Sequence, residues 1–349
     1  MHVSEILDYH KLIEHRDNRL VSARSHPTLP LTIWNYTDAA QYGWRFDETL
    51  IQCRGLVLDE DGRVIARPFS KFMSADQPGH AEIDLDEPVE IFDKADGSLI
   101  CVSQDPEYGA VISSRGSFES DQAKLAAELF HRKYDRFEFP TNFTTIFELT
   151  GPSNRIVLEY SEDELILLGG RKIDSGKVYT PPRVGWEWNW PGRVVEKFPY
   201  TTIRELLLQP DRAGAEGYVI YTNDGRMLKH KFDAYVDLHR IIFGMSENTI
   251  FERLVNGETR LEMIASLPDE IYDWADEVAT RLEANYNVIS QQIEIDFQAT
   301  EQAAGLLDRK KFAQIATQKS YPAALFARLD GKNLNKIIWN YVNIDRKRS

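Results

Sequence analysis

Cysteine is scarce in this 349-residue chain, which contains only Cys53 and Cys101 and no Cys-x-x-Cys pair. A disulfide framework and a zinc knuckle are therefore excluded, and we expect two ordinary buried thiols. No stretch approaches the roughly 18 consecutive apolar residues of a membrane span, and the first 17 residues lack the apolar segment of a secretory signal. We therefore expect a cytoplasmic protein that has no membrane partner.

Positive charge is also in deficit, with 41 Lys and Arg residues against 55 Asp and Glu residues and a formal net charge of −14. A phosphate backbone repels such a surface. The distribution is uneven, because residues 309–349 hold ten bases and two acids, whereas residues 247–308 hold three bases and fourteen acids. The basic C-terminal segment is either an RNA contact or a solvated run of charge.

Several familiar motifs are absent from the sequence, including GxGxxG, HExxH and GxSxG. The residues that end at Gly176-Lys177 do not form a P-loop. Arg171 stands where that motif needs Gly, and Val178 stands where it needs Ser or Thr. The eight histidines are scattered, so neither a metal cluster nor a Ser-His pair is indicated.

Short β-rich runs fill the first two-thirds of the chain. We predict strands at residues 31–36, 50–58, 64–66, 89–92, 99–103, 110–114, 144–149, 155–160, 165–169, 217–222 and 227–232, and a helix at 120–134. From about residue 232 the pattern turns helical, with an amphipathic helix predicted from Asp269 to beyond Phe297. The fold class is α+β: an antiparallel-rich domain at 1–240 followed by an all-α domain at 241–349. The Trp-rich stretch 185–192 is predicted to be a loop packed on the core, with base stacking as the alternative.

The most distinctive sequence is Lys94-Ala95-Asp96-Gly97-Ser98, between two predicted strands. Alone it is also compatible with a hairpin turn in which Asp-Gly supplies positive φ. If Lys94 is a nucleophile, it needs positive charge or desolvation around it, because an amine with a pKa of about 10.4 is protonated and inert at neutral pH.

Residues elsewhere could surround such a lysine. Lys229 and Lys231 are two residues apart in a predicted strand, so they share one face, although alternating lysines can also protect a sheet edge. Glu148 lies within an apolar strand and Glu216 opens another, and a buried glutamate is costly unless it meets a cation or metal. With Asp96 they form a candidate trio around hydrated magnesium. Further cations at strand ends are Arg54, Arg67, Lys71 and Arg115.

Four segments resemble, in order and spacing, the motifs of the covalent nucleotidyltransferases, which include polynucleotide ligases and mRNA capping enzymes. The matches are residues 94–98 to motif I, 147–148 to motif III, 216–220 to motif IV and 229–231 to motif V. The sequences at 53–55, 67–72 and 114–117 make the chain most similar to the RNA ligase 1 family, known from bacteriophages that repair cleaved tRNA. This resemblance implies an ATP-grasp-like ligase domain followed by a helical domain that helps to select a tRNA or other RNA.

The resemblance also implies a reaction. Lys94 would attack the α-phosphorus of ATP to form lysyl-AMP, AMP would pass to an RNA 5′-phosphate, and a 3′-OH would displace it. The implied cofactors are ATP as the AMP donor and Mg²⁺, for which Mn²⁺ can substitute. The implied partner is RNA with 5′-phosphate and 3′-OH ends, expected to be a tRNA. We expect a monomer, in the host cytoplasm if the chain is phage-encoded.

The resemblance assigns roles to individual residues. Lys229, Lys231, Arg54 and Lys71 would assist Lys94 in catalysis. The nucleotide would be bound by Tyr36, Arg54, Lys71, Lys94, Gly97, Arg115, Glu148, Glu216, Gly217, Lys229 and Lys231. Asp96, Glu148 and Glu216 would hold the metal through its waters. The chain departs from the family at Arg115, where Lys is common, and at Met73, where an aromatic is common. Which side chain stacks on adenine is left open, with Tyr36 one candidate.

Two other interpretations remain. A DNA ligase or a capping enzyme shares the lysine motif but adds an OB-fold, which would give several short strands after residue 231. A non-catalytic RNA-binding module is disfavoured by the intact Lys94, Lys229 and Lys231.

Overall fold

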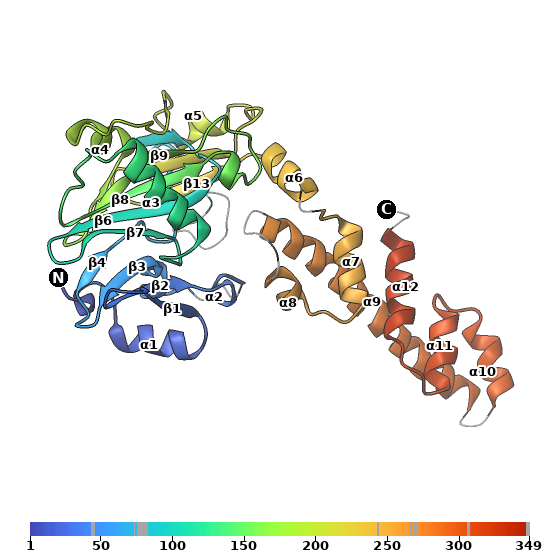
Figure 1. Ribbon diagram of the computed structural model, residues 1–349. Coiled ribbons are helices and arrows are strands. Elements are labelled where there is room, and N and C mark those ends of the chain that lie inside the picture. Colours follow the sequence, from blue (N-terminus) through green and yellow to red (C-terminus); the bar gives the residue numbers. More distant parts are fainter. Residues whose placement is uncertain are drawn as a thin grey trace. The chain divides into compact units, whose positions relative to one another are not determined.

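The computed structural model describes residues 1–42, 46–72, 74, 83–242, 244–265, 267, 271–305 and 308–346. The chain divides into two compact units, Met1–His239 and Arg240–Ser349. Antiparallel sheets and helices build unit 1, and the described elements of unit 2 are all helices (Figure 1). The predicted α+β class with a helical C-terminal region is confirmed. The assignment of residues 1–240 to a ligase domain and of residues 241–349 to a domain that helps to select the RNA stays a prediction.

Three antiparallel sheets form unit 1. The first contains β1 (Val21–Ser25), β2 (Leu31–Tyr36), β3 (Arg54–Asp59) and β4 (Val64–Ala66), in that order. The second has the spatial order β10 (Val178–Tyr179), β9 (Glu164–Lys172), β8 (Phe143–Thr150), β6 (Ser98–Asp105) and β7 (Gly109–Ser114). The third has the order β11 (Lys197–Phe198), β5 (Val89–Asp93), β12 (Gly217–Thr222) and β13 (Met227–Lys231).

Helices connect these strands. The α-helices of unit 1 are α1 (Tyr9–Asp17), α2 (Asp38–Tyr42), α3 (Asp121–Lys133), α4 (Pro181–Glu187) and α5 (Ile203–Leu207), and the 3₁₀ helices are η1 (Val3–Glu5), η2 (Leu50–Gln52) and η3 (Pro152–Asn154). Helix α6 (Asp233–Ile242) runs from unit 1 into unit 2. Helix α3 begins where the Ser120 hydroxyl accepts a hydrogen bond from the Ala123 N–H, and it buries Leu129 and Phe130.

The second and third sheets pack face to face through an apolar cluster that includes Phe92 of β5, Tyr221 of β12, Ile146 of β8 and Ile166 of β9. A separate cluster covers the opposite face of the second sheet with residues of α3 and α4, and another covers the opposite face of the third sheet with residues of α5 and α6. Side chains alternate along a strand, so the residues next to those in the two outer clusters point to the other face of their sheet. That face lies toward the space between the two sheets. The candidate site lies there.

Unit 2 consists of α7 (Glu247–Val255), α8 (Arg260–Ala265), α9 (Tyr272–Ala304), α10 (Arg309–Ala316), α11 (Pro322–Leu329) and α12 (Asn335–Arg346). Helix α9 buries the predicted apolar stripe that includes Val278, Leu282 and Phe297, whereas the predicted N-cap Asp269 lies outside the described residues. No strand follows β13 in the described part of the chain, so the OB-fold expected of a DNA ligase is not seen there. Among the helices that the structure describes, none is long and apolar enough to cross a membrane.

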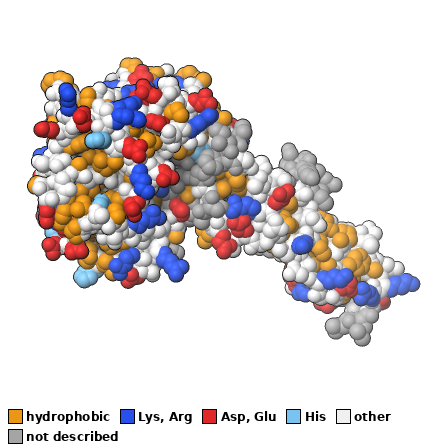
Figure 2. All heavy atoms as spheres, in the orientation of Figure 1, with side chains coloured by type: hydrophobic (Ala, Val, Ile, Leu, Met, Phe, Trp, Pro, Cys, Tyr) orange, Lys and Arg blue, Asp and Glu red, His pale blue; other side chains and the backbone are white. Residues whose placement is uncertain are grey.

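Charged side chains of both signs are interspersed on the visible face of both units (Figure 2). The two cysteines are buried, and burial raises the pKa of the Cys53 and Cys101 thiols to about 12, which keeps both neutral. In the Trp-rich stretch 185–192, only residues 185–187 belong to helix α4, and residues 188–192 form a turn and loop. Trp190 is buried against Phe130 and Phe147, while Trp186 is 83% exposed.

Two strand predictions are wrong. Residues 50–52 form the 3₁₀ helix η2, and β3 begins only at Arg54. Residues 155–160 form no strand, because the N–H groups of Val157 and Leu158 donate to the carboxylate of Asp96 instead of to a neighbouring strand.

Candidate active site

Lys94 lies at the end of β5, where this strand meets the start of β12. Its backbone N–H donates to the Gly217 carbonyl at 3.0 Å, and its Nζ is 2.6 Å from Glu216 Oε1. The side chain of Lys94 is 21% exposed, whereas that of Glu216 is only 2% exposed. A cation thus reaches a buried carboxylate, as the sequence requires for Glu216.

Lys231 approaches the same carboxylate, with its Nζ 3.3 Å from Glu216 Oε1. On β13, Met227 packs into the cluster between the two sheets and Leu228 packs into the outer cluster. Lys229 and Lys231 follow Met227 at intervals of two, so all three share the face between the sheets. The structure therefore brings both lysines to the side of the sheet that carries Lys94.

Two glycines permit the close packing around Lys94. Gly217 has a φ of +152°, and a Cβ there would lie 2.0 Å from the His230 carbonyl oxygen. A Cβ at Gly97 would lie 2.2 Å from the Leu149 carbonyl oxygen. A side chain at either position would push apart strands that hold the lysine loop.

The Glu148 carboxyl group, on β8, belongs to the same group of charges. Burial raises the pKa of Glu148 to about 8, and the nearby Glu216 and Asp96 carboxylates raise it too, while Lys94 and Arg54 oppose the rise. Glu148 therefore interacts electrostatically with Lys94, Arg54, Asp96 and Glu216. In the absence of further cations, Glu148 is therefore largely protonated at neutral pH.

Asp96 has a different environment. Its side chain is 3% exposed, Oδ2 accepts hydrogen bonds from the Val157 and Leu158 N–H groups at 2.9 and 2.6 Å, and Oδ1 accepts from the Tyr235 hydroxyl at 2.8 Å. The Asp96 N–H donates to the Tyr160 hydroxyl oxygen. The side chain and backbone of Asp96 therefore connect the lysine loop to the 157–160 segment and to α6, which the sequence did not indicate.

Direct metal binding by Asp96, Glu148 and Glu216 finds no support in the geometry. Among the residues that the structure describes, no three His, Cys, Asp or Glu side chains are grouped to hold a metal ion. Binding through metal-bound waters stays a prediction. Glu148 and Glu216 fit it better than Asp96, whose two oxygens already accept three hydrogen bonds.

Three further predicted cations lie against aromatic rings. The Arg54 guanidinium carbon is 5.2 Å from the Phe72 ring centroid, Lys71 Nζ is 5.0 Å from that of Tyr36, and the Arg115 guanidinium carbon is 5.5 Å from it. Arg54 Nη1 is buried with no hydrogen-bond partner among the described residues. Such an orphaned donor fits an anionic group like a phosphate.

The candidates for adenine stacking are not equally placed. Tyr36 is 5% exposed and its ring is already contacted by Lys71, Arg115 and the edge-on Phe46 ring. That environment disfavours Tyr36 as a platform for a base. Met73 lies outside the described residues.

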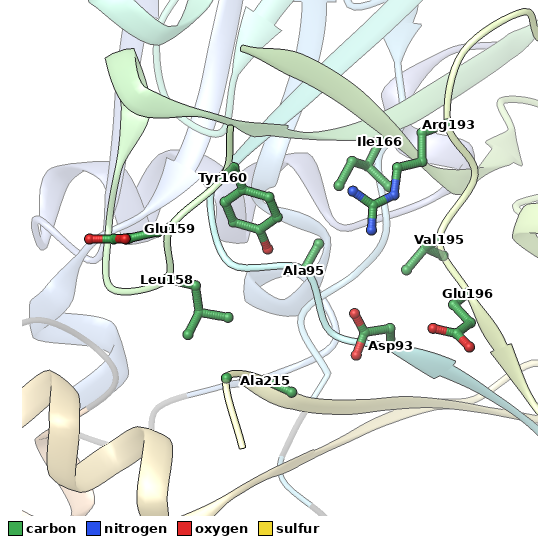
Figure 3. A pocket seen from close by; sticks show the side chains of 11 residues that line it. Asp93, Ala95, Leu158, Glu159, Tyr160, Ile166, Arg193, Val195, Glu196 and Ala215 are labelled. Atoms are coloured by element: carbon green, nitrogen blue, oxygen red, sulfur yellow. The ribbon is translucent and has the colours of Figure 1, made fainter. Parts of the chain in front are cut away.

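A cavity of about 130 Å³ opens beside the lysine loop (Figure 3). Asp93 and Ala95, the two neighbours of Lys94, line it together with Tyr160, Ile166 and Val195. Its remaining lining residues are Leu158, Glu159, Arg193, Glu196, Gly214 and Ala215. The sequence did not predict this cavity, because its walls come from segments that are far apart in the chain.

The Lys94 amine thus contacts a buried carboxylate that Lys231 also reaches, and the cavity opens beside it. The model of a family described as RNA ligase matches residues 52–236, which is more than half of the 349 residues. The chain belongs to this RNA ligase family, within the nucleotidyltransferase superfamily. The family prediction is confirmed.

Individual relatives are distant. An RNA ligase from Rhodothermus phage RM378 is 23% identical over an alignment that covers 83% of this chain and 83% of the phage protein. A Naegleria gruberi RNA ligase mutant solved with AMP and Mn is 19% identical, with a TM-score of 0.36, over 45% of this chain and 53% of that chain. The same ligase solved with PPi gives 17% identity and a TM-score of 0.35, over 44% of this chain and 52% of that chain. The matched part spans about half the length of the Naegleria ligase.

The raised pKa of Glu148 predicts a pH-dependent stability. Because this pKa is about 8 in the folded protein against an ordinary 4.5, the folded state keeps a proton that the unfolded state loses. This contribution to stability is fully present below pH 4.5 and is lost as the pH rises to about 8. The Glu148→Gln variant lacks the titration, so its free energy of unfolding relative to the wild type should increase by at least about 1 kcal/mol between about pH 5 and about pH 9.

Chemical denaturation of the nucleotide-free protein at both pH values measures this difference. Glu128→Gln, on the exposed face of α3, is the matched control and should show no such change. An unchanged difference between Glu148→Gln and the wild type at the two pH values would refute the assignment.

Proposed function

We propose that this protein joins RNA ends that carry a 5′-phosphate and a 3′-OH, with ATP as the AMP donor and Lys94 as the nucleophile. The observation that carries the proposal is the buried contact of Lys94 Nζ and Lys231 Nζ with one oxygen of Glu216. This contact fixes the amine at the end of β5, next to a cavity and within a group of cations. Positioning and charge neutralisation are what nucleotidyl transfer demands of a protein.

The first step forms a bond between Lys94 Nζ and the α-phosphorus of ATP and breaks the bond to the bridging oxygen, so that pyrophosphate leaves. The amine must first lose a proton, and Glu216 Oε1, at 2.6 Å, is within reach to accept it. The RNA 5′-phosphate then displaces the lysine and takes up AMP. Finally, the 3′-OH of the second end attacks that 5′-phosphorus, and AMP leaves.

The phosphates are proposed to lie among Lys229, Lys231, Arg54, Lys71 and Arg115. Positive charge there would stabilise the charge that develops on non-bridging oxygens. A divalent ion, Mg²⁺ or Mn²⁺, would supply further charge neutralisation when bound. Glu148 and Glu216 would hold it through water molecules.

The cavity beside Lys94 is proposed to receive the nucleobase. The Tyr160 ring, Ile166 and Val195 offer apolar walls, and the carboxylates of Asp93 and Glu196 lie on one side as acceptors for an exocyclic amine (Figure 3). Ile166 is the ladder partner of Glu148, so a ribose near Glu148 would place its base at this cavity. Tyr160 then replaces Tyr36 as the proposed stacking residue.

The finer identity of the substrate is also proposed. The helical unit 2 would help to select the RNA, expected to be a tRNA, and the protein would act as a monomer in the cytoplasm. Residues 309–349, with ten bases and two acids, would contribute positive charge to that contact.

The role of Lys94 is tested by its covalent adduct. With ATP labelled in the α-phosphate and Mg²⁺, the wild type should become labelled, whereas Lys94→Ala should lose the label entirely, because no other amine occupies that position. Lys124→Ala, at an exposed position on α3, is the control and should label like the wild type. Denaturing gel electrophoresis detects the adduct, and label retained by Lys94→Ala would sink the assignment.

The cavity is tested by filling it. Val195→Phe places a bulky ring where we expect the base, so the KM for ATP in adduct formation should rise by about tenfold or more, equivalent to about 1.4 kcal/mol of lost binding. Val288→Phe, on an exposed position of α9, should leave the KM unchanged. An unaltered KM in a folded Val195→Phe protein would place the base elsewhere.

The substrate class is tested by competition between nucleic acids. We expect sealing of a 5′-phosphate, 3′-OH RNA to exceed sealing of a matched nick in duplex DNA by about a hundredfold or more, equivalent to roughly 2.7 kcal/mol in transition-state binding. Initial rates with the two substrates at equal concentration measure the ratio. Equal or faster sealing of the DNA nick would favour a DNA ligase.

A further inference from the structure

Arg171, on β9, is a buried guanidinium that no part of the proposed reaction uses. It is 8% exposed, and its Nε donates to the Gly176 carbonyl at 2.9 Å. Its Nη1 donates to the Pro68 carbonyl and the Ser70 hydroxyl, both at 2.9 Å, and to Gln52 Oε1 at 3.1 Å. One side chain therefore joins β9 to three other segments of the chain.

None of these acceptors is charged. Within the described part of the chain no carboxylate is hydrogen-bonded or ion-paired to Arg171, and the neighbouring charge that it senses is another cation, Arg67. A buried charge without a counter-charge is costly, and an apolar side chain would fill the same space at lower cost. Packing alone therefore gives a poor account of this arginine.

The segments that Arg171 joins are those that present two predicted phosphate-binding cations. Gln52 ends η2 and stands two residues before Arg54, while Ser70 directly precedes Lys71. The two segments also bind each other, since the Lys71 N–H donates to the Ile51 carbonyl at 2.8 Å and the Ser70 hydroxyl donates to Gln52 Oε1 at 3.2 Å. The Arg171 guanidinium lies at this junction.

We infer that Arg171 is a positioning residue for the ATP-dependent step, which sets Lys71 and Arg54 at the triphosphate by fixing the 50–52 and 68–71 segments to β9. The inference rests on the proposed function, because it assigns those two cations to the nucleotide. A planar fork with several donors can bind the Pro68, Ser70 and Gln52 acceptors together, whereas an ammonium on a flexible chain cannot reproduce that geometry. Arg171 acts through its neighbours and contacts no reacting atom.

Two reactions separate positioning from a general structural role. Formation of the lysine adduct requires the triphosphate of ATP, whereas sealing of chemically pre-adenylylated RNA in the absence of ATP does not. In Arg171→Lys, we expect the KM for ATP in adduct formation to rise by about tenfold, because the charge remains while the cations lose their alignment. Sealing of pre-adenylylated RNA should fall by no more than about twofold.

Arg204→Lys is the matched control, since Arg204 is exposed and pairs with Asp86 at the surface, and it should change neither reaction. A second check combines Arg171→Lys with Lys71→Ala. If Arg171 acts through Lys71, the double variant should have nearly the KM of Lys71→Ala alone.

Two outcomes would overturn the inference: an equal loss in both reactions of Arg171→Lys, which marks a purely structural residue, and an unchanged KM for ATP. Failure of the proposed function looks different. In that case the wild type itself forms no lysine adduct, and no comparison of variants arises.

Discussion

One buried carboxylate organises the site. Glu216 is 2% exposed, and the amines of Lys94 and Lys231 both reach its Oε1. A carboxylate in that position would be strongly destabilising without a cation, so the lysines and Glu216 can be buried only together. The contact that positions Lys94, the proposed nucleophile, therefore also compensates for the burial of Glu216.

The packing of the two sheets makes this contact strong. Aromatic and aliphatic residues such as Phe92, Ile146 and Tyr221 fill most of the space between the sheets, and they exclude water from the edge of the charged group. Electrostatic interactions gain strength where water is excluded. The raised pKa of Glu148 is the clearest sign of that environment, since burial is its main cause.

The sequence predicts the position of a residue in the site where a local pattern determines it. Lys229 and Lys231 need only a strand and its alternation to share a face, and Glu148 is conspicuous among apolar neighbours. Contacts between segments that are distant in the chain could not be predicted from the sequence. Asp96 resembles a metal ligand in the motif, yet its hydrogen-bond partners stand 61, 62 and 139 residues further along the chain. The same contacts explain why the strand predicted at 155–160 is wrong. Its apolar side chains are typical of a strand, but the N–H groups of Val157 and Leu158 donate to Asp96. The sequence indicated Arg171 only as a residue that rules out a P-loop, because its four acceptors come from three segments that no local pattern joins.

The net charge of −14 is compatible with the proposed phosphate-binding residues, because much of the excess acid lies elsewhere in the chain. Arg63, for example, is shared by Asp59, Asp105 and Glu107. Among the predicted site residues, Arg54, Lys71 and Arg115 lie against aromatic rings, and Arg54 Nη1 is buried with no hydrogen-bond partner among the described residues. The proposed phosphate contacts are therefore a few partly buried cations in a chain with an excess of acids, rather than a basic surface. Such an arrangement suits a nucleotide or a strand end better than a continuous duplex, whose phosphates would meet the acidic surface along their length.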